Sequence, residues 1–253
     1  MNPTVVGIVV FACAFCGALG GIRLRTILPD QHLSDESRDT IKVGIGLIAT
    51  MTALVLGLVT ASAKSSFDEQ NRTIKHTAAD ILSLDRVLAQ YGPETAEIRK
   101  AMKLALAGRI EMMWSQDQSQ RACLEAGDAA RGAELLAGRL RGLTPQTDDQ
   151  RWLRSRALDL SERVLEARWL VFAGHSGSVP VAFLVTLVFW LTITFASFGL
   201  FAPRNATVVT VLFVCAISVA GAAFLILELD GQFEGLITVS AEPLKYALAQ
   251  LGQ

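Results

Sequence analysis

Hydrophobic positions along the chain gather in four long stretches that contain no charged residue. These stretches cover residues 5–22, 43–63, 179–202 and 206–227. A helix needs about 20 predominantly apolar residues to cross the hydrocarbon core of a bilayer, and each stretch is long enough. The pattern therefore predicts four transmembrane helices, arranged as two hairpins on either side of a polar region.

The second apolar stretch continues into the polar region without a helix breaker. Ser34 is a suitable N-cap for a helix that begins near Asp35 and enters the lipid at Val43. Beyond residue 63 the sequence has no Gly or Pro until Gly92 and Pro93, and its apolar positions keep a helical spacing: Phe67, Ile74, Ile81, Leu84 and Leu88. We expect one helix of about 55 residues that extends tens of ångströms beyond the membrane.

Three more helices are predicted in the polar region and one in the tail. The first follows Pro93 and has an apolar side of Ile98, Met102, Ala105, Leu106, Ile110 and Met113. The second covers about residues 129–141. The third is capped by Thr147, runs over about residues 148–173, and turns these residues inward: Trp152, Leu153, Leu160, Val164, Leu165 and Trp169. The tail helix begins at Pro243 and has a stripe of Leu244, Ala247, Leu248 and Leu251.

These elements predict an all-α integral membrane protein, with four transmembrane helices in two hairpins around a helical extramembrane bundle. The expected parts are a first hairpin (1–63), a helical insert (64–178), a second hairpin (179–228) and a tail (229–253) with a short amphipathic helix. No segment of the insert alternates with the period of a strand.

Composition sharpens this picture and excludes several classes of protein. Of the 253 residues 51% are hydrophobic and 19% are charged, whereas soluble domains carry about 25% charged residues. An ordinary soluble enzyme, a collagenous chain and a disordered chain are therefore excluded. The net charge is -1, and the insert holds 17 basic and 16 acidic residues without a basic stripe. Lipid is the expected partner, and nucleic acid is not.

No motif in the sequence points to catalysis, a cofactor or a metal. The three histidines, His32, His76 and His175, have no second ligand at the spacing of a metal site, and the motifs of zinc proteases, P-loop proteins and serine hydrolases are missing from the sequence. Cys13 and Cys16 form a C-x-x-C inside an apolar stretch, which indicates small apolar packing rather than redox chemistry. We therefore expect neither an enzyme nor a bound cofactor.

Small residues and hydroxyls in the spans suggest two possibilities. Gly17 and Gly21 form a small-residue face in the first span, and Ala53, Gly57 and Ala61 form one in the second. Such faces allow close helix packing, either within one chain or between subunits. No Asp, Glu, Lys or Arg lies at mid-membrane, and the polar residues of the second and third spans are hydroxyls: Thr50, Thr52, Thr60, Ser62, Thr186, Thr192, Thr194 and Ser197.

This composition suits a pore lined by hydroxyls and aliphatic constrictions better than a proton-coupled pump. Thr50 and Leu54 share a face of the second span, one helical turn apart, and are our candidate pore-lining residues.

Polar residues at the ends of the spans are further candidates. Arg204 and Asn205 lie at the turn of the second hairpin, where they either cap carbonyls or meet lipid headgroups. Glu228 and Asp230 follow the fourth span and either attract ions at a vestibule or pair with basic residues of the insert. Lys64 marks the end of the second span.

The orientation in the membrane follows from two counts that disagree. The short connectors carry Arg23, Arg25, Arg38, Lys42 and Arg204, and the tails carry only Lys245, which favours connectors in the cytosol. The basic residues that flank the insert match them in number and favour a cytosolic insert: Lys64, Arg72, Lys75, Arg163 and Arg168.

Three segments give the chain a family resemblance. Residues 28–68 (LPDQHLSDES…SAKSSFD), 84–94 (LDRVLAQYGPE) and 189–236 (FWLTITFASFGLFAPRN…LELDGQFEGL) resemble the bestrophin-like family of bacterial membrane proteins. The resemblance implies a distant likeness to bestrophins, which are pentameric anion channels with four membrane helices and a helical cytosolic part. It places the protein in a bacterial inner membrane with the insert in the cytosol. Neither the aromatic neck nor the acidic calcium clasp of bestrophins has matching positions here.

Two functional hypotheses follow. The first is an oligomeric, channel-like membrane protein, which the resemblance makes a pentamer that passes anions. The second is a non-conducting scaffold or sensor, in which the long second helix transmits a signal to the insert. The number of subunits separates the two hypotheses, because a pore on the symmetry axis requires an oligomer.

Overall fold

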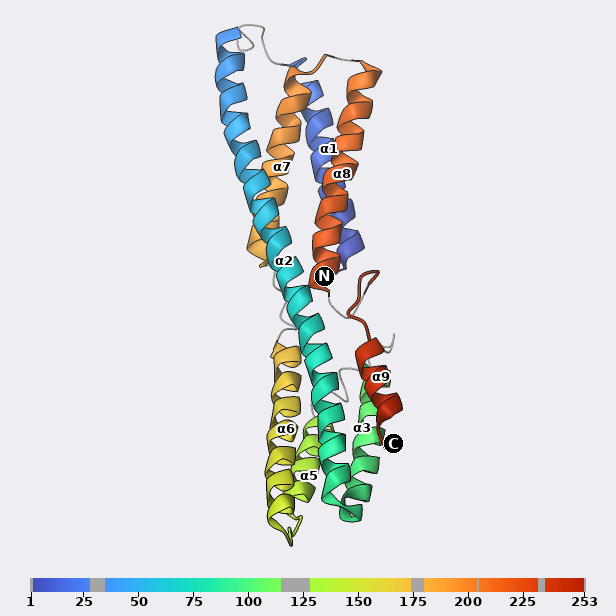
Figure 1. The fold of residues 1–253 in the computed structure, drawn as a ribbon. Coiled ribbons are helices and arrows are strands. Elements are labelled where there is room, and N and C mark those ends of the chain that lie inside the picture. Colours follow the sequence, from blue (N-terminus) through green and yellow to red (C-terminus); the bar gives the residue numbers. More distant parts are fainter. Residues whose placement is uncertain are drawn as a thin grey trace. The chain divides into compact units, whose positions relative to one another are not determined.

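The computed structural model describes residues 2–27, 35–114, 128–173, 180–203, 205–231 and 235–252. Over these residues the chain is all helical, as predicted (Figure 1). The helices are α1 (Pro3–Leu24), α2 (Asp35–Tyr91), η2 (Pro93–Thr95), α3 (Ala96–Met113), α5 (Asp128–Arg141), α6 (Asp148–Ala173), α7 (Val181–Phe201), α8 (Ala206–Asp230) and α9 (Glu242–Gln250). Four of them, α1, α2, α7 and α8, are long and apolar enough to cross a membrane.

Local capping signals determine where the helices begin and end. The Thr147 side chain accepts a hydrogen bond from the backbone N–H of Gln150 at 3.1 Å and caps α6, as predicted. Gly92 has a φ of 137°, which a residue with a side chain rarely adopts, and it ends α2. The predicted long helix is confirmed, with 57 residues. The predicted N-cap Ser34 lies outside the described residues.

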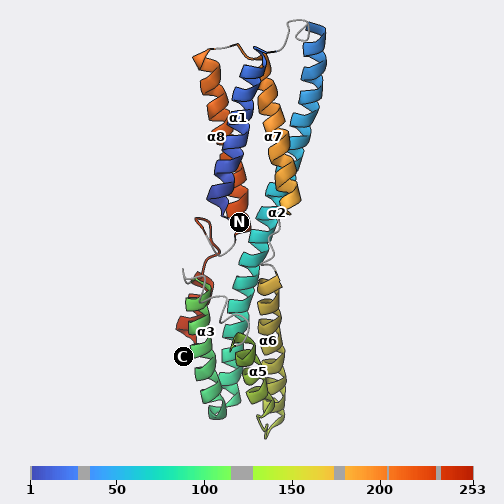
Figure 2. The ribbon, with the colours of Figure 1, turned by 180° about the vertical axis from the view of Figure 1, so that it is seen from behind.

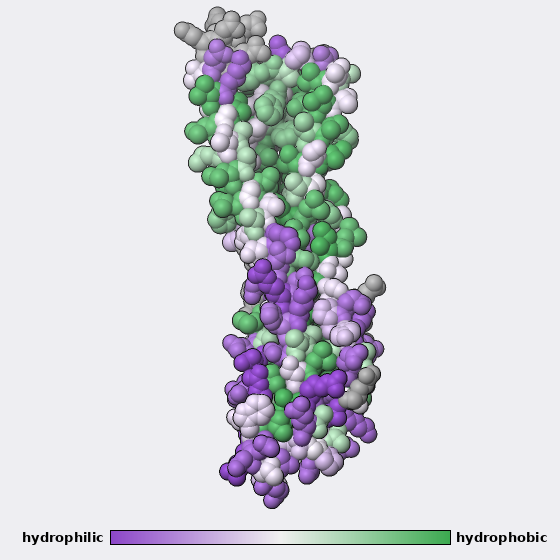
Figure 3. All heavy atoms as spheres, in the orientation of Figure 1, coloured by the Kyte–Doolittle hydropathy of each residue, from purple (hydrophilic) through white to green (hydrophobic). Residues whose placement is uncertain are grey.

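The chain divides into two compact units. One contains Met1–Phe67 and Gly177–Ile237, and the other contains Asp68–Ser176 and Thr238–Gln253. The helix α2 contributes its first part to the first unit and its second part to the second unit. The surface of the first unit is largely apolar in Figure 3, which is typical of lipid-facing spans, whereas the second unit carries most of the polar surface.

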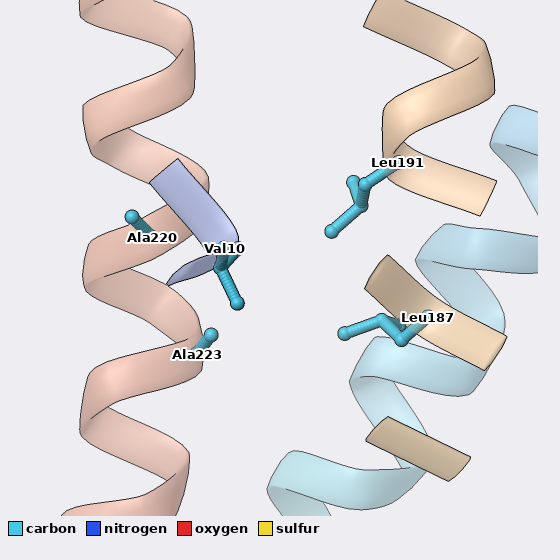
Figure 4. Close-up of a cluster of buried hydrophobic side chains, with 5 residues drawn as sticks. All are labelled: Val10, Leu187, Leu191, Ala220 and Ala223. Carbon is cyan, nitrogen blue, oxygen red and sulfur yellow. The ribbon is translucent and has the colours of Figure 1, made fainter. Parts of the chain in front are cut away.

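Three helices, α1, α7 and α8, form the core of the first unit (Figures 1 and 2). One cluster joins Val10 of α1 to Leu187 and Leu191 of α7 and to Ala220 and Ala223 of α8 (Figure 4). A second cluster contains Ala14, Ala18, Phe195, Leu212 and Ala216. The alanines of α1 and α8 alternate with the large side chains of α7, so the three helices pack closely.

Glycine sets the distance between α1 and α7. A Cβ atom added to Gly21 would collide with the carbonyl oxygen of Ala196, and one added to Gly199 would collide with that of Ala18. A Cβ on Gly17 would lie 2.9 Å from the carbonyl oxygen of Thr192. The small-residue face of the first span therefore serves packing within the chain, which is one of the two possibilities that the sequence left open.

The small-residue face of α2 has no such contact with the residues that the structure describes. An added Cβ on Gly57 would meet no atom within 4 Å, and Ala53 and Ala61 are exposed. In the most apolar 18-residue segment of α2 only 6% of the residues are buried. In the corresponding segments of α1 and α7 the share is 22%, and in that of α8 it is 28%. Most of the apolar surface of α2 is thus left for lipid or for another subunit.

The second unit buries the apolar faces that the periodicity predicts. Ile74, Ile81, Leu84 and Leu88 of α2 are buried, and so are Ile98, Met102, Leu106 and Ile110 of α3 and Leu244, Ala247 and Leu251 of the tail. Ala105 was predicted on the buried side of α3 but is exposed.

The inward prediction for Trp152 and Trp169 is wrong. Their exposed fractions are 65% and 59%, whereas Leu153 and Leu160 are buried as predicted. At about 100° per residue, Trp152 and Trp169 lie about 100° and 160° around α6 from Leu153, so they fall outside the buried stripe. Apolar character alone had suggested their burial.

A buried ion pair attaches the tail to α2 and α3. Arg99 donates two hydrogen bonds to the carboxylate of Asp85, at 2.7 and 2.9 Å, and the backbone N–H of Gly252 donates a third at 3.3 Å. Lys103 donates to the carbonyl oxygen of Leu251 at 2.7 Å. Burial raises the pKa of the Asp85 carboxyl, but the bonds from Arg99 and Gly252 outweigh it, and this pKa lies below its usual value.

The glycine contact predicts a position-specific loss of stability. Gly21→Ala should lower the free energy of unfolding by about 1–3 kcal/mol, because α1 and α7 must move apart. Gly20→Ala is the matched control, since an added Cβ there meets no atom within 4 Å. The measurement is the thermal midpoint in detergent, followed by tryptophan fluorescence. Equal midpoints for the two variants would show that the close approach is unimportant.

The ion pair predicts a pH dependence of stability. Because the pKa of Asp85 is lower in the folded protein than in the unfolded chain, its contribution is complete above about pH 4 and is lost as the pH falls through the folded pKa. Asp85→Asn should remove this contribution at neutral pH and lower stability by about 3 kcal/mol, because it leaves Arg99 without its carboxylate. Asp159→Asn, at an exposed carboxylate of α6, is the control. A stability of Asp85→Asn equal to that of the control would contradict the role of the pair.

Candidate functional site

Thr50 and Leu54, the candidate pore-lining residues, lie on the exposed side of α2. The Thr50 hydroxyl donates to the carbonyl oxygen of Gly46 at 2.8 Å. Leu54 is 66% exposed. Both side chains therefore face away from the three-helix core of their own unit, on a surface that one chain leaves uncovered.

The exposed side of α2 divides into two neighbouring stripes. The small stripe consists of Gly46, Thr50, Ala53, Gly57 and Ala61, and the large stripe consists of Val43, Leu47, Met51, Leu54 and Leu58. At about 100° per residue the centres of the stripes lie roughly a quarter turn apart. Thr50 belongs to the first stripe and Leu54 to the second, so the two candidates lie at the boundary between them.

Several threonine hydroxyl groups within the spans donate their hydrogen atoms to the backbone of their own helix. Each donates to the carbonyl oxygen four residues earlier: Thr52 to Ile48 at 2.7 Å, Thr60 to Leu56 at 2.7 Å and Thr192 to Val188 at 2.7 Å. This local bond lets a threonine lie in an apolar environment without a distant partner. The oxygen atoms of exposed threonines such as Thr50 and Thr60 keep acceptor capacity toward the outside of the helix.

Glu228 is buried and lies against Gly235 and Leu236. Its side chain is 4% exposed, and its carboxylate accepts a hydrogen bond from the backbone N–H of Leu236 at 2.7 Å. Gly235 has a φ of 102°, and a Cβ there would collide with this carboxylate. Gly235 was not among the residues predicted from the sequence, although a glycine after the acidic residues Glu228, Asp230 and Glu234 was the available signal. Asp230 is partly exposed in the last turn of α8.

Lys64 and Asn205 have local roles at the ends of their helices. The Lys64 ammonium lies 5.5 Å from the centre of the Phe67 ring, a cation–π contact on α2. The Asn205 side chain accepts a hydrogen bond from the backbone N–H of Val208 at 2.9 Å. Asn205 therefore caps the N–H groups at the start of α8, whereas the sequence had suggested that Arg204 or Asn205 caps carbonyl groups or meets lipid headgroups.

The C-terminal end of α7 is capped by the residue that follows α1. Arg25, which follows α1, donates to the carbonyl oxygen of Ala202 at 2.6 Å. From the sequence, Arg25 was predicted only to be one of the basic residues in the first connector. Nothing in the sequence shows that residues 25 and 202 are neighbours. Arg204, the predicted partner of Asn205 at this turn, lies outside the described residues.

The candidate residues do not form one reaction centre. Thr50 and Leu54 lie within the apolar part of α2, Lys64 lies at its end, and Glu228 is held by its own loop. Within the described part of the chain no group of three or more His, Cys, Asp or Glu side chains could hold a metal ion. What the described residues offer is an extended surface of small residues, hydroxyls and aliphatic side chains along α2.

Two solved structures share this architecture. Both are variants of a bacterial bestrophin homologue from Klebsiella pneumoniae, each with one residue changed to threonine. They are 14% and 15% identical to this chain, with TM-scores of 0.66 and 0.67, and each alignment covers 98% of this chain and 99% of the other. At this identity the likeness shows the fold. No curated protein is significantly similar to the chain.

The family follows from the sequence match. The profile described as a bestrophin-like domain matches residues 11–244, which is most of the chain. This match agrees with four membrane-span candidates and with the shared fold. The chain therefore belongs to the bestrophin-like family of membrane proteins.

Proposed function

We propose that the protein assembles into a homo-oligomer that conducts ions across the membrane through a path lined by α2. The observation that carries this proposal is the exposure of α2: only 6% of its most apolar window is buried within one chain. The other three spans pack on one another, and α2 does so to a much smaller extent. An assembly of several chains would cover the rest of α2.

The composition of the small stripe supports contact with protein or water rather than with lipid alone. Gly57 presents no side chain, and an added Cβ there would meet no atom within 4 Å. Lipid tails offer no advantage to a glycine over a larger apolar residue, whereas a neighbouring helix can approach a glycine closely. Water in a pore can hydrogen-bond to exposed threonine oxygens such as that of Thr50.

The two stripes also suggest how a path along α2 would work. Thr50, whose hydroxyl hydrogen is donated to the carbonyl oxygen of Gly46, would hold water in the path through its oxygen atom. Leu54, one turn further, would form an aliphatic constriction of the kind that gates by dewetting. Residues 43–63 contain no charged side chain, so no titratable group is available there to couple transport to protons. The proposal is therefore passive conduction. Its preferred ion, an anion, and its pentameric state follow the family resemblance.

A non-conducting scaffold or sensor is the second candidate function. It is favoured by the continuity of α2, a single helix of 57 residues that contributes to both units. A rigid helix of this kind could transmit movement from the membrane to the extramembrane helices. The same measurements distinguish the two functions, since a sensor requires no conducting path.

The first test measures ion flux with purified protein in liposomes, together with the number of subunits by native mass spectrometry. We expect an oligomer that passes anions, and Leu54→Ala should change the conductance several-fold by widening the constriction. Leu225→Ala is the matched control, because Leu225 is an exposed leucine of α8 (51%). A monomer, or an intact oligomer that passes neither anions nor cations, would exclude the channel and favour the sensor.

The second test determines the orientation of the chain. We expect the second unit in the cytosol, as the resemblance implies, and the short connectors outside. In a background with the four native cysteines changed to serine, Glu162→Cys on α6 should resist a membrane-impermeant maleimide in intact cells and react after lysis. Thr26→Cys, in the first connector, should react in intact cells. The reverse pattern would mean that the charge count of the short connectors decides the topology.

A further inference from the structure

A cavity lies between α2 and α7 in the first unit. Its volume is about 390 Å³, within the range of roughly 300–1,000 Å³ that is typical of small-molecule sites. The lining is largely apolar and consists of Lys42, Ile45, Gly46 and Ala49 of α2 and Ser197, Phe198, Phe201 and Ala202 of α7. The cavity arises because these parts of the two helices separate, as both ribbon views indicate (Figures 1 and 2).

Two cationic side chains accompany this apolar cavity. Lys42 is part of its lining. Arg25 donates a hydrogen bond to the carbonyl oxygen of Ala202, which is also part of the lining, so its guanidinium group lies next to a residue that lines the cavity. Both residues are exposed, and both flank the apolar part of a membrane-span candidate. The site thus combines an apolar interior with cations at the depth where lipid headgroups are found.

Asp39 is the acidic neighbour that an anion would have to compete with. Its carboxylate lies 2.9 Å from the Lys42 ammonium, and the two side chains are 74% and 56% exposed. An exposed pair of neighbouring residues on one helix is a weak ion pair, because water screens it and both side chains are mobile. A phosphate group, which Arg25 can bind through two N–H groups at once, can therefore displace Asp39 from Lys42.

We propose that this cavity binds an anionic glycerophospholipid, with one acyl chain between α2 and α7 and its phosphate on Lys42 and Arg25. The apolar lining contacts the acyl chain of the lipid. The two cations bind its phosphate and so favour an anionic headgroup. A small polar ligand fits less well, because Lys42 and Ser197 are the polar side chains among the described lining residues. The proposal does not depend on ion conduction, because its readout is lipid binding.

Two glycines of α2 provide a matched pair of variants. An added Cβ on Gly46 or Gly44 meets no atom within 4 Å, so both positions accept a side chain. Of these two glycines, Gly46 lines the cavity and Gly44 does not. Gly46→Leu should fill the cavity, and Gly44→Leu should leave it open. Lys42→Gln keeps the length of the side chain approximately and removes its charge.

The experiment is native mass spectrometry of the purified, full-length oligomer with added phosphatidylglycerol or phosphatidylcholine. Wild type and Gly44→Leu should retain phosphatidylglycerol in preference to phosphatidylcholine. Gly46→Leu should bind phosphatidylglycerol at least tenfold more weakly, and Lys42→Gln should lose the preference between the two lipids. Thermal midpoints confirm that each variant is folded.

Several outcomes would overturn the proposal. Undiminished binding of phosphatidylglycerol by Gly46→Leu would place the lipid elsewhere, and equal binding of both lipids by wild type would remove the role of the cations. A change in subunit number in Gly46→Leu, with lipid binding unaltered, would mean that a second copy of the chain fills the cavity. If Gly46→Leu does not fold, Lys42→Gln still decides, because unchanged headgroup selectivity in that variant contradicts the site.

Discussion

The close approach of α1 and α7 is the contact on which the first unit depends. Gly21 and Gly199 each lie against a carbonyl oxygen of the facing helix, and no residue with a side chain fits at either position without moving it. At this separation the alanines of α8 can complete a three-helix core with Leu187 and Leu191. Because bilayer lipids do not drive apolar helices together, such shape complementarity is the main source of helix association within a membrane.

The compact three-helix core has a direct consequence for α2. Val55 and Leu56 pack against the core cluster, but the preceding turns of α2 separate from α7 and leave the cavity next to Ala49. The outward face of α2 carries both a small and a large stripe, and of the residues in these stripes Gly46 also lines the cavity. Of the four spans α2 is therefore the least buried, and it is the helix that continues into the second unit.

Much of this fold could be predicted from sequence because its determinants are local. Gly92 ends α2 and Thr147 caps α6 through contacts within a few residues, and the apolar period of α2 after Phe67 identifies Ile74 and Leu88 as buried. The bonds of Arg25 and Glu228 could not be predicted because they depend on neighbours that are distant along the chain or in a loop, whereas the prediction for Trp152 failed because it followed apolar character instead of the helical period. Trp152 is apolar but lies beside the buried stripe rather than on it.

The same limit applies to the candidate site. Thr50 and Leu54 were identified by hydropathy and period, which also describe a lipid-facing helix. The position of Arg25 depends on a hydrogen bond to a residue 177 positions away, and that of Glu228 depends on a hydrogen bond from the backbone N–H of Leu236.

The division of α2 into two stripes shows what sequence hydropathy leaves out. A scale of apolar character treats Gly57, Ala53 and Leu54 as members of one span, and lipid is compatible with all three. Their physical consequences differ, however, because only a neighbouring helix or a water-filled path makes use of the space beside Gly57 and the oxygen of Thr50. Leucine and methionine in the large stripe are stable against lipid and protein alike. The arrangement of small residues, rather than the total hydrophobicity, is therefore the property of α2 that favours an assembly of several chains over a single chain in lipid.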